Sequence, residues 1–390
     1  MAQLTSNKRK TTMDHASKAQ ALTALNSFRR EHPHVTASAL SAILKTVRQS
    51  EPPELYSRKD IMLASKTVTE QATPYGPMLV PIKILNNKGE TQEIPALNPF
   101  AFLDVAARQS GAFSDQLKQV AKETSPDSPL RLAVYSDEIV PGNALKGDNL
   151  RKTWAVYATF LNFGQIALQN EDAWFPLVTV RSSLVSATPA SIGLIFKELL
   201  KLWFENPDAD VVNSGILLFF PDGEYTRVFV KLDMILQDGS AHKFTYGVKG
   251  DSGTRYCFLC KNVVARDSAI AKRSGSQIVS DITCVRSMNF ATDDEVRSAV
   301  NRLREAQTGM NKADFDKYQQ VVGINFNEHG LLFCKELEKH LKPVSAFCHD
   351  WQHCFFVSGT FQTCVNLLLE ASEIGLKTLY TMLGTYCQKA

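Results

Sequence analysis

Short apolar runs in the middle of the chain predict a β-sheet, and one longer amphipathic run predicts a helix packed against it. The strand-like runs are rich in β-branched and aromatic residues and lie at 131–138, 153–164, 175–182, 215–221 and 226–238. Between the third and fourth runs, apolar residues recur at 192, 195, 196, 199, 200 and 203, the spacing of one helix face. This order predicts an α/β layer whose first three strands form an antiparallel meander beside a parallel pairing.

The part of the chain before residue 130 shows mainly a helical pattern broken by prolines. Residues 16–49 are predicted to form two helices separated at Pro33. The prolines between 74 and 99 predict edge strands or an extended connector rather than a core, and two helices are expected within 98–123. We therefore expect an all-helical region with a proline-rich joint up to about residue 129.

The part after residue 262 is predicted to be helical throughout. One helix should begin after Thr292, because a threonine followed by the acidic residues 293–295 is a typical helix start. Another is expected in 313–323, and the apolar residues from 349 onward recur at helical spacing. We interpret this part as a helical insertion packed beside the sheet.

Composition and charge are those of a globular protein with a basic beginning. The 390 residues are 44% hydrophobic and 21% charged, with a formal net charge of +3. Residues 1–59 hold ten Lys or Arg against four Asp or Glu, so the basic excess is N-terminal. It could contact phosphates, and Lys8-Arg9-Lys10 could act as a nuclear address, although a solvated arm is the commoner meaning of such a run.

Cysteine usage and apolar run length indicate an intracellular protein outside the membrane. The eight cysteines lie at irregular positions, all at or after 257, which does not suggest a disulfide framework. The longest purely apolar runs, such as 216–220, are far shorter than the roughly 20 residues that span a bilayer. We expect no membrane partner and no signal segment at the polar start.

Two carboxylates are expected at strand ends. Asp137 closes the first predicted strand and Asp238 closes the strand at 226–238, where a glycine follows. Ligand carboxylates commonly occupy this place on an α/β sheet, although an Asp before Gly is more often a turn former. Two converging carboxylates can hold Mg²⁺ or Mn²⁺ ions that cleave a phosphodiester. Glu138 should point to the opposite face, because neighbouring side chains alternate along a strand.

A cysteine pair and several basic residues follow the second carboxylate. Cys257 and Cys260 have the C-x-x-C spacing of half a Zn²⁺ site, and ordinary buried thiols are the competing interpretation. Lys249 lies beside Gly250 in a glycine-punctuated basic stretch, and Arg255 and Lys261 flank the cysteines. We expect Lys249, Arg255 and Lys261 to lie near DNA phosphates.

The order VYSDE, a strand pair, L-x-x-x-L-x-D-x-x-A, V-K-G-x-x-G and C-x-x-C-x-N resembles the catalytic region of eukaryotic cut-and-paste transposases of the CACTA/Mirage/Chapaev kind, including their KDZ and Plavaka relatives. The resemblance covers about 131–370. It implies an RNase H-like mixed sheet flanked by helices, Asp137 and Asp238 as the first two members of a D-D-E metal triad, and Cys257 and Cys260 as zinc ligands. It further implies a nuclear protein that has DNA as its partner, with Mg²⁺ (or Mn²⁺) and Zn²⁺ as cofactors, and it is compatible with a homo-oligomer.

A later D-x-x-H, Asp350 and His353, fits a motif that recurs at a fixed place in these relatives. In a competing assignment, His349 and His353 complete the zinc site, and Glu370 or Glu373 becomes the catalytic glutamate. In the family pattern the zinc histidines and the final Glu lie further along, so the resemblance implies a C-terminally truncated copy.

Two functions are consistent with these motifs. The first is a metal-dependent DNA transposase or its inactive remnant, and the second is a non-catalytic, zinc-stabilised DNA-binding or scaffold protein. The expected divisions are a basic helical N-terminal region at 1–60, a proline-rich connector with helices at 61–129, a partial RNase H-like catalytic core at 130–262, and a helical, zinc-associated insertion at 263–390.

Overall fold

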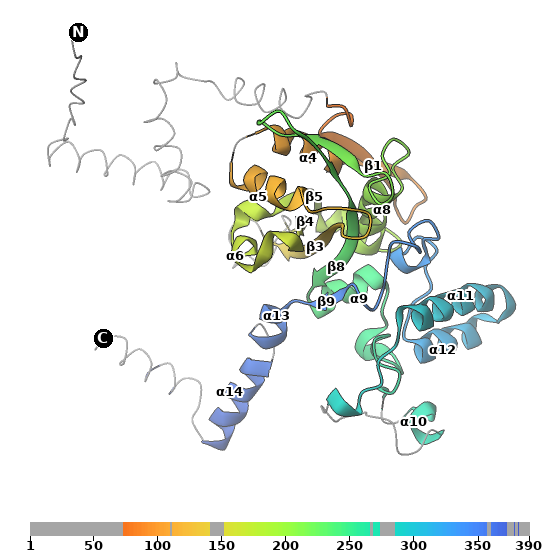
Figure 1. Cartoon of the computed structure of the whole chain (residues 1–390). Coiled ribbons are helices and arrows are strands. Elements are labelled where there is room, and N and C mark those ends of the chain that lie inside the picture. The colour runs from red at the N-terminus through yellow and green to blue at the C-terminus, as the bar shows by residue number, and fades with distance from the viewer. Residues whose placement is uncertain are drawn as a thin grey trace, which may run out of the picture. The chain divides into compact units, whose positions relative to one another are not determined.

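The computed structural model describes residues 73–109, 111–140, 152–265, 268–273, 285–356 and 360–372, together with residues 378 and 381 (Figure 1). The chain divides into two compact units, Met1–Thr67 and Val68–Ala390, and every described residue belongs to the second unit. The predicted N-terminal helices, Lys8-Arg9-Lys10 and Glu373 lie outside the described residues.

A five-stranded mixed sheet forms the centre of the described unit (Figure 1). Its strands are β3 (Leu130–Ile139), β4 (Thr153–Phe160), β5 (Phe175–Arg181), β8 (Val230–Gln237) and β9 (Phe347–His349). They lie in the order β5-β4-β3-β8-β9, where β3, β4 and β5 pair antiparallel and β8 runs parallel to both β3 and β9. This arrangement confirms the predicted α/β layer with an antiparallel meander beside a parallel pairing.

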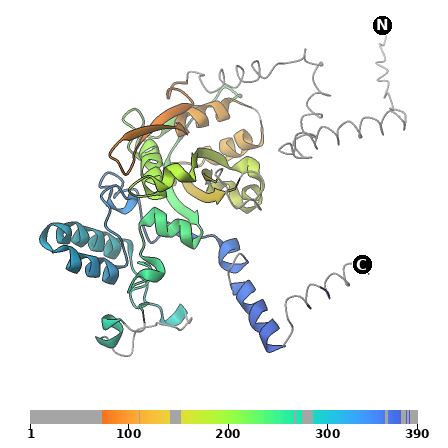
Figure 2. The same cartoon turned by 180° about the vertical axis from the view of Figure 1, so that it is seen from behind.

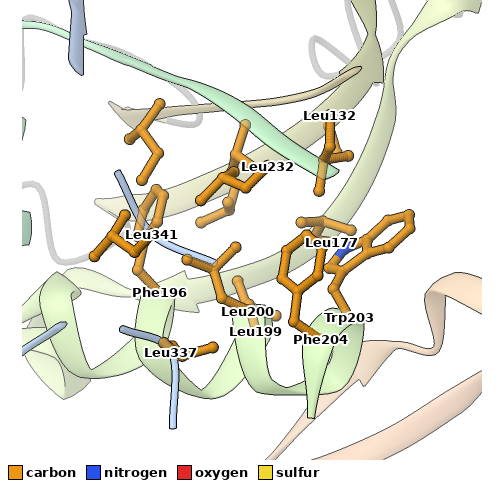
Figure 3. Packing of buried hydrophobic residues seen from close by; sticks show 14 of the residues in the cluster. Leu132, Leu177, Phe196, Leu199, Leu200, Trp203, Phe204, Leu232, Leu337 and Leu341 are labelled. Atoms are coloured by element: carbon orange, nitrogen blue, oxygen red, sulfur yellow. The ribbon is translucent and has the colours of Figure 1, made fainter. Parts of the chain in front are cut away.

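The predicted amphipathic helix is α8 (Ile192–Phe204), which packs against the sheet. Figure 3 shows its apolar side chains, among them Phe196 and Leu200, directed toward Leu132 and Leu232 of the strands. Trp203 of α8 is 1% exposed and lies edge-on to the rings of Phe100 and Phe160. These rings join the sheet, α8 and the preceding helix α4 in one hydrophobic core.

The region before the sheet contains a β-hairpin as well as helices. The two predicted helices are α4 (Pro99–Arg108) and α5 (Ala112–Ala121), and Asn98 caps α4. The proline-rich segment forms β1 (Leu79–Leu85) and β2 (Thr91–Leu97), which pair antiparallel. The strands expected in this segment are therefore present, and an all-helical region is not. The expectation that the segment lies outside the core was wrong, because Ile82, Ile84 and Ile94 are buried in the hydrophobic core. Alternate residues of both strands face the core while the residues between them face solvent.

Shorter elements complete this part of the molecule. They are α6 (Gly164–Leu168), α7 (Ser182–Ser186) and the hairpin of β6 (Ile216–Phe219) and β7 (Tyr225–Val228).

Residues 239–346 lie between the fourth and fifth strands of the sheet in chain order. They contain α9 (Gly239–Tyr246), α10 (Ala269–Arg273), α11 (Asp293–Gly309) and α12 (Lys312–Val322). The start of α11 is as predicted, because Thr292 and Glu295 form a reciprocal capping box. Figure 2 shows α11 and α12 side by side as a helical pair.

The chain then returns to the sheet. Strand β9 adds to the edge of β8 and is followed by α13 (Trp351–Phe355) and α14 (Thr360–Ala371). The prediction of helices throughout 263–390 therefore missed one strand.

Candidate functional site

Three carboxylates lie at the ends of three neighbouring parallel strands. In the β3–β8 pairing Tyr135 is opposite Leu236, so Asp137 and Asp238 each follow two residues later. In the β8–β9 pairing Gln237 is opposite His349, so Asp350 follows β9 as Asp238 follows β8. The sheet thus brings together residues that are more than a hundred positions apart in sequence. We call Asp137, Asp238 and Asp350 the carboxylate edge.

Asp238 is fixed by the helix that it begins. It is the N-cap of α9, and its Oδ1 accepts a hydrogen bond of 2.5 Å from the backbone N–H of Ala241. A carboxylate is favourable there because the first N–H groups of a helix lack partners. Asp238 therefore both follows the end of a strand and forms the turn into the next helix, so the two interpretations of this residue are compatible.

Asp350 is fixed from both sides. Its backbone N–H donates to the carbonyl of Gln237 at 2.7 Å, which ties it to the end of β8. Its Oδ1 accepts from the N–H of Gln352 at 2.8 Å, and its Oδ2 lies 2.7 Å from Nδ1 of His353. This hydrogen bond raises the pKa of His353 and favours the protonated imidazole.

The charges of all three carboxylates act on two side chains, Tyr135 and His353. Tyr135 donates to Oδ2 of Asp137 at 3.4 Å. Burial is the largest cause that raises the pKa of Tyr135, and the negative charges of Asp137, Asp350 and Asp238 raise this pKa further. The hydrogen bond that His353 donates to Asp350 raises the pKa of His353 most, and the charges of the same three carboxylates raise it further. Charges act on a pKa in this way only over short distances, so Tyr135 and His353 both lie beside the carboxylate edge.

Glu138 lies apart from this space. Lys152 holds its carboxylate at 3.0 Å, and its pKa is lowered by hydrogen bonds from Ser182 and Lys152, which outweigh the effect of burial. The choice of Asp137 rather than Glu138 agrees with this arrangement.

Glu370 is not brought to the carboxylate edge. It lies near the end of α14, whose described side chains include none that is buried. Ten helical residues separate it from Thr360, which corresponds to about 15 Å along the helix axis. In the part of the chain that the structure describes, no contact joins Glu370 to the three carboxylates.

Cys257 and Cys260 lie on either side of a short turn. The N–H of Leu259 donates to Sγ of Cys257 at 3.4 Å. Burial raises the pKa of Cys257, and the N–H groups of Leu259 and Phe258 act against this rise. N–H groups directed at a sulfur stabilise a thiolate, which is the form that binds zinc.

The described structure does not bring His349 and His353 together with Cys257 and Cys260, as the competing zinc assignment requires. Burial lowers the pKa of His349 and the charge of Asp238 opposes this, while His353 is bonded to Asp350. Both histidines therefore belong to the surroundings of the carboxylate edge, and two further ligands for Cys257 and Cys260 are not found among the described residues.

The three basic residues differ in their surroundings. Lys261 pairs with Glu295 at 2.8 Å. Burial lowers the pKa values of both Lys249 and Arg255, and Nε of Arg255 is buried without a hydrogen-bond acceptor in the described structure. Only Arg255 therefore combines burial with an unused donor.

The donor chemistry at the carboxylate edge fits Mg²⁺ or Mn²⁺, since both prefer oxygen ligands. Within the described ranges, no three His, Cys, Asp or Glu side chains are gathered closely enough to hold a metal ion. Asp238 and Asp350 are instead directed toward helix N–H groups. The two cysteines fit half of a tetrahedral Zn²⁺ site.

Two parts of this site were missed or undervalued by sequence reasoning. Asp350 was recognised only as part of a motif, because β9 was not predicted. His242 was not noticed at all, although it is 1% exposed, bonds through Nε2 to the carbonyl of Cys348 at 2.7 Å and stacks on Phe347. Burial lowers the pKa of His242 to about 4. The sequence signal for His242 was its position four residues after Asp238, on the helix that Asp238 caps.

No protein-family model matches the chain, and no curated protein is similar to it.

One helical stretch, Trp351–Ala371, is long and apolar enough to cross a membrane, a criterion that core helices of soluble proteins also meet. The stretch includes residues outside the described ones, and the absence of a membrane partner remains a prediction.

Proposed function

We propose that this chain cleaves and transfers DNA phosphodiesters as the catalytic region of a transposase, or is an inactive remnant of one. The observation that carries the proposal is the position of Asp137, Asp238 and Asp350 at three neighbouring parallel strand ends. Metal-dependent phosphoryl transfer needs such convergent carboxylates in a rigid arrangement.

The sheet order supports an RNase H-like assignment. Counted along the chain, the five strands of this sheet stand in the order 3-2-1-4-5, and only the second runs against the others. An antiparallel meander that continues into parallel strands, with carboxylates on the first and fourth, is what the resemblance implies. Residues 239–346, inserted before the fifth strand, contain the cysteine pair that we propose as half of a zinc site.

The side chains of the carboxylate edge have separable roles in this proposal. Asp137 and Asp238 would hold the metal ions, which would activate the attacking oxygen and stabilise the leaving oxygen when bound. Asp350 adds the third carboxylate and orients His353. Protonated His353 supplies a positive charge beside the phosphate that the site would bind.

The proposal is tested by cleavage of a labelled DNA duplex with Mg²⁺ or Mn²⁺. Asp238→Asn is the best variant, because asparagine also caps helices and so preserves the start of α9. We expect it to lower the cleavage rate by on the order of 100-fold or more, as does removal of other groups that stabilise transition-state charge. Glu138→Gln is the matched control and should change the rate by less than about threefold, because its carboxylate faces away from the site.

The second candidate function, a non-catalytic DNA-binding or scaffold protein, is favoured by one observation. No described group of three ligands is closed around a metal position. A wild-type chain that binds DNA but does not cleave it with either metal would support this candidate and contradict catalysis. Cleavage that survives Asp238→Asn would contradict the assignment of the site.

A further inference from the structure

A large cavity lies in the insertion, between the cysteine turn and the helical pair of α11 and α12. Its volume is about 650 Å³. Arg255 and Lys261 line it from the cysteine turn, Arg302 from α11 and Tyr318 from α12. We call it the Arg255 cavity.

The acidic residues of the cavity wall are already neutralised. Glu295 accepts from Lys261 at 2.8 Å and from the backbone N–H of Thr292 at 2.8 Å. Asp294 lies 3.0 Å from the guanidinium of Arg297. These pairs leave Arg255 and Arg302 as the cations of the lining for which no carboxylate partner occurs among the described residues.

Of these two cations, Arg255 has the stronger unmet need for a hydrogen-bond acceptor. Its Nε is buried and has no acceptor within the described structure, and its backbone N–H is held by the carbonyl of Gln320 at 3.1 Å. A guanidinium donor buried without an acceptor is unfavourable, so an anionic group bound at this position would stabilise it. A planar guanidinium matches the two oxygens of a phosphate.

One aromatic contact connects the lining of the cavity to the strand that precedes Asp350. Phe258 lines the cavity, and its ring centroid is 5.7 Å from that of Phe347 in β9. Phe347 lies three residues before Asp350. A nucleic-acid strand at the carboxylate edge could therefore place a neighbouring phosphate in the cavity, since its charges repeat at short intervals.

We propose that the Arg255 cavity binds a backbone phosphate of DNA, with Arg255 as the buried anchor and Arg302 at the exposed side. This inference rests on the proposed function, because that function brings DNA to the neighbouring carboxylates. It adds Arg302 to the predicted DNA contacts and gives Lys261 the separate role of neutralising Glu295.

Binding of a short fluorescent duplex to the full chain, measured by anisotropy over a range of salt concentrations in buffer without added Mg²⁺ or Mn²⁺ and without a chelator, tests the proposal. We expect Arg255→Gln and Arg302→Gln each to weaken binding about 5-fold and to lower the salt dependence by about one released ion. Lys83→Gln on the exposed face of β1 removes the same charge and should weaken binding less than 2-fold. Arg302 is exposed, so its variant tests the cavity even if Arg255→Gln disturbs folding.

Two results would overturn the inference. Either both arginine variants bind DNA as Lys83→Gln does, or the wild-type chain does not bind DNA. A polyglutamate peptide that binds as tightly as DNA, and loses affinity equally in the variants, would instead show a site for carboxylates. Because binding is measured without added Mg²⁺ or Mn²⁺, these results are independent of cleavage, and the cleavage test of Asp238→Asn can fail or succeed separately.

Discussion

The carboxylate edge and the cysteine turn are built in different ways, although both hold candidate ligands. Asp137 lies near the end of β3, and Asp238 and Asp350 directly follow β8 and β9, which pair in register with their neighbours up to these ends. Residues 249–264 contain one short 3-10 turn, and two isolated bridges, Arg255↔Val264 and Cys260↔Phe290, hold them. Backbone pairing therefore fixes the positions of the carboxylates, whereas a few local contacts hold the cysteines.

The largest expected effect comes from the hydrophobic core of the sheet that carries the carboxylate edge. Phe160 is fully buried in β4 and packs against Trp203 and Phe175. Phe160→Ala should lower the free energy of unfolding by about 3–5 kcal/mol, measured by urea denaturation. Phe244→Ala is the control, because Phe244 is 47% exposed, and it should cost about 0.5 kcal/mol or less. Equal effects of the two changes would contradict the packing that positions the strand ends.

Acid should weaken the attachment of β9 through His242. The folded-state pKa of this buried histidine is about 4, below its ordinary value of 6.5, so the unfolded chain binds a proton first as the pH falls. Its contribution is present above pH 6.5 and is lost progressively between pH 6.5 and pH 4. The loss reaches about 3 kcal/mol at 1.4 kcal/mol per pH unit.

Urea denaturation at several pH values checks this prediction. His242→Phe keeps an aromatic ring beside Phe347 but cannot take a proton, so its stability should fall less over the same range. A wild-type chain and a variant with parallel pH profiles would show that His242 does not titrate as described.

Removal of metal should loosen the cysteine turn and leave the sheet unchanged. We expect a zinc chelator to raise hydrogen exchange at the N–H of Leu259, which donates to Cys257, by at least about tenfold. The amides of β3 and β8 should be unchanged. Cys257→Ser should reproduce the effect without a chelator, whereas identical exchange with and without the chelator would speak against zinc at this turn.

Sequence patterns predicted the elements that are defined by local apolar spacing. Strand β8 and the position of Asp238 followed from a β-branched run that ends before a glycine. The α11 start followed from Thr292 and its acidic first turn. Such signals lie within a few residues of one another, so a single sequence contains them.

Strand β9 and the third carboxylate were not predicted, for a physical reason. Phe347–His349 is only three residues long and carries no alternating pattern of its own. It becomes a strand because β8 offers an unpaired edge. Pairing of this kind depends on distant parts of the chain, and Asp350 gains its place only through it.

The buried hairpin shows the opposite case, in which a local signal was present. Ile82 and Ile84 alternate with exposed residues in β1, which is the period of a half-buried strand. The neighbouring prolines outweighed that alternation in the sequence interpretation. Pro81 and Pro95 are in fact paired with each other across the two strands.

The central claim is that Asp137, Asp238 and Asp350 surround one metal-binding space. Paramagnetic broadening of Tyr135 and His353 signals by Mn²⁺ in NMR spectra tests it most directly, because both side chains lie beside all three carboxylates. We predict broadening of both residues in the wild-type chain and its loss in Asp137→Asn, with no loss in Glu138→Gln. Broadening that is absent, or that persists unchanged in Asp137→Asn, would contradict the claim.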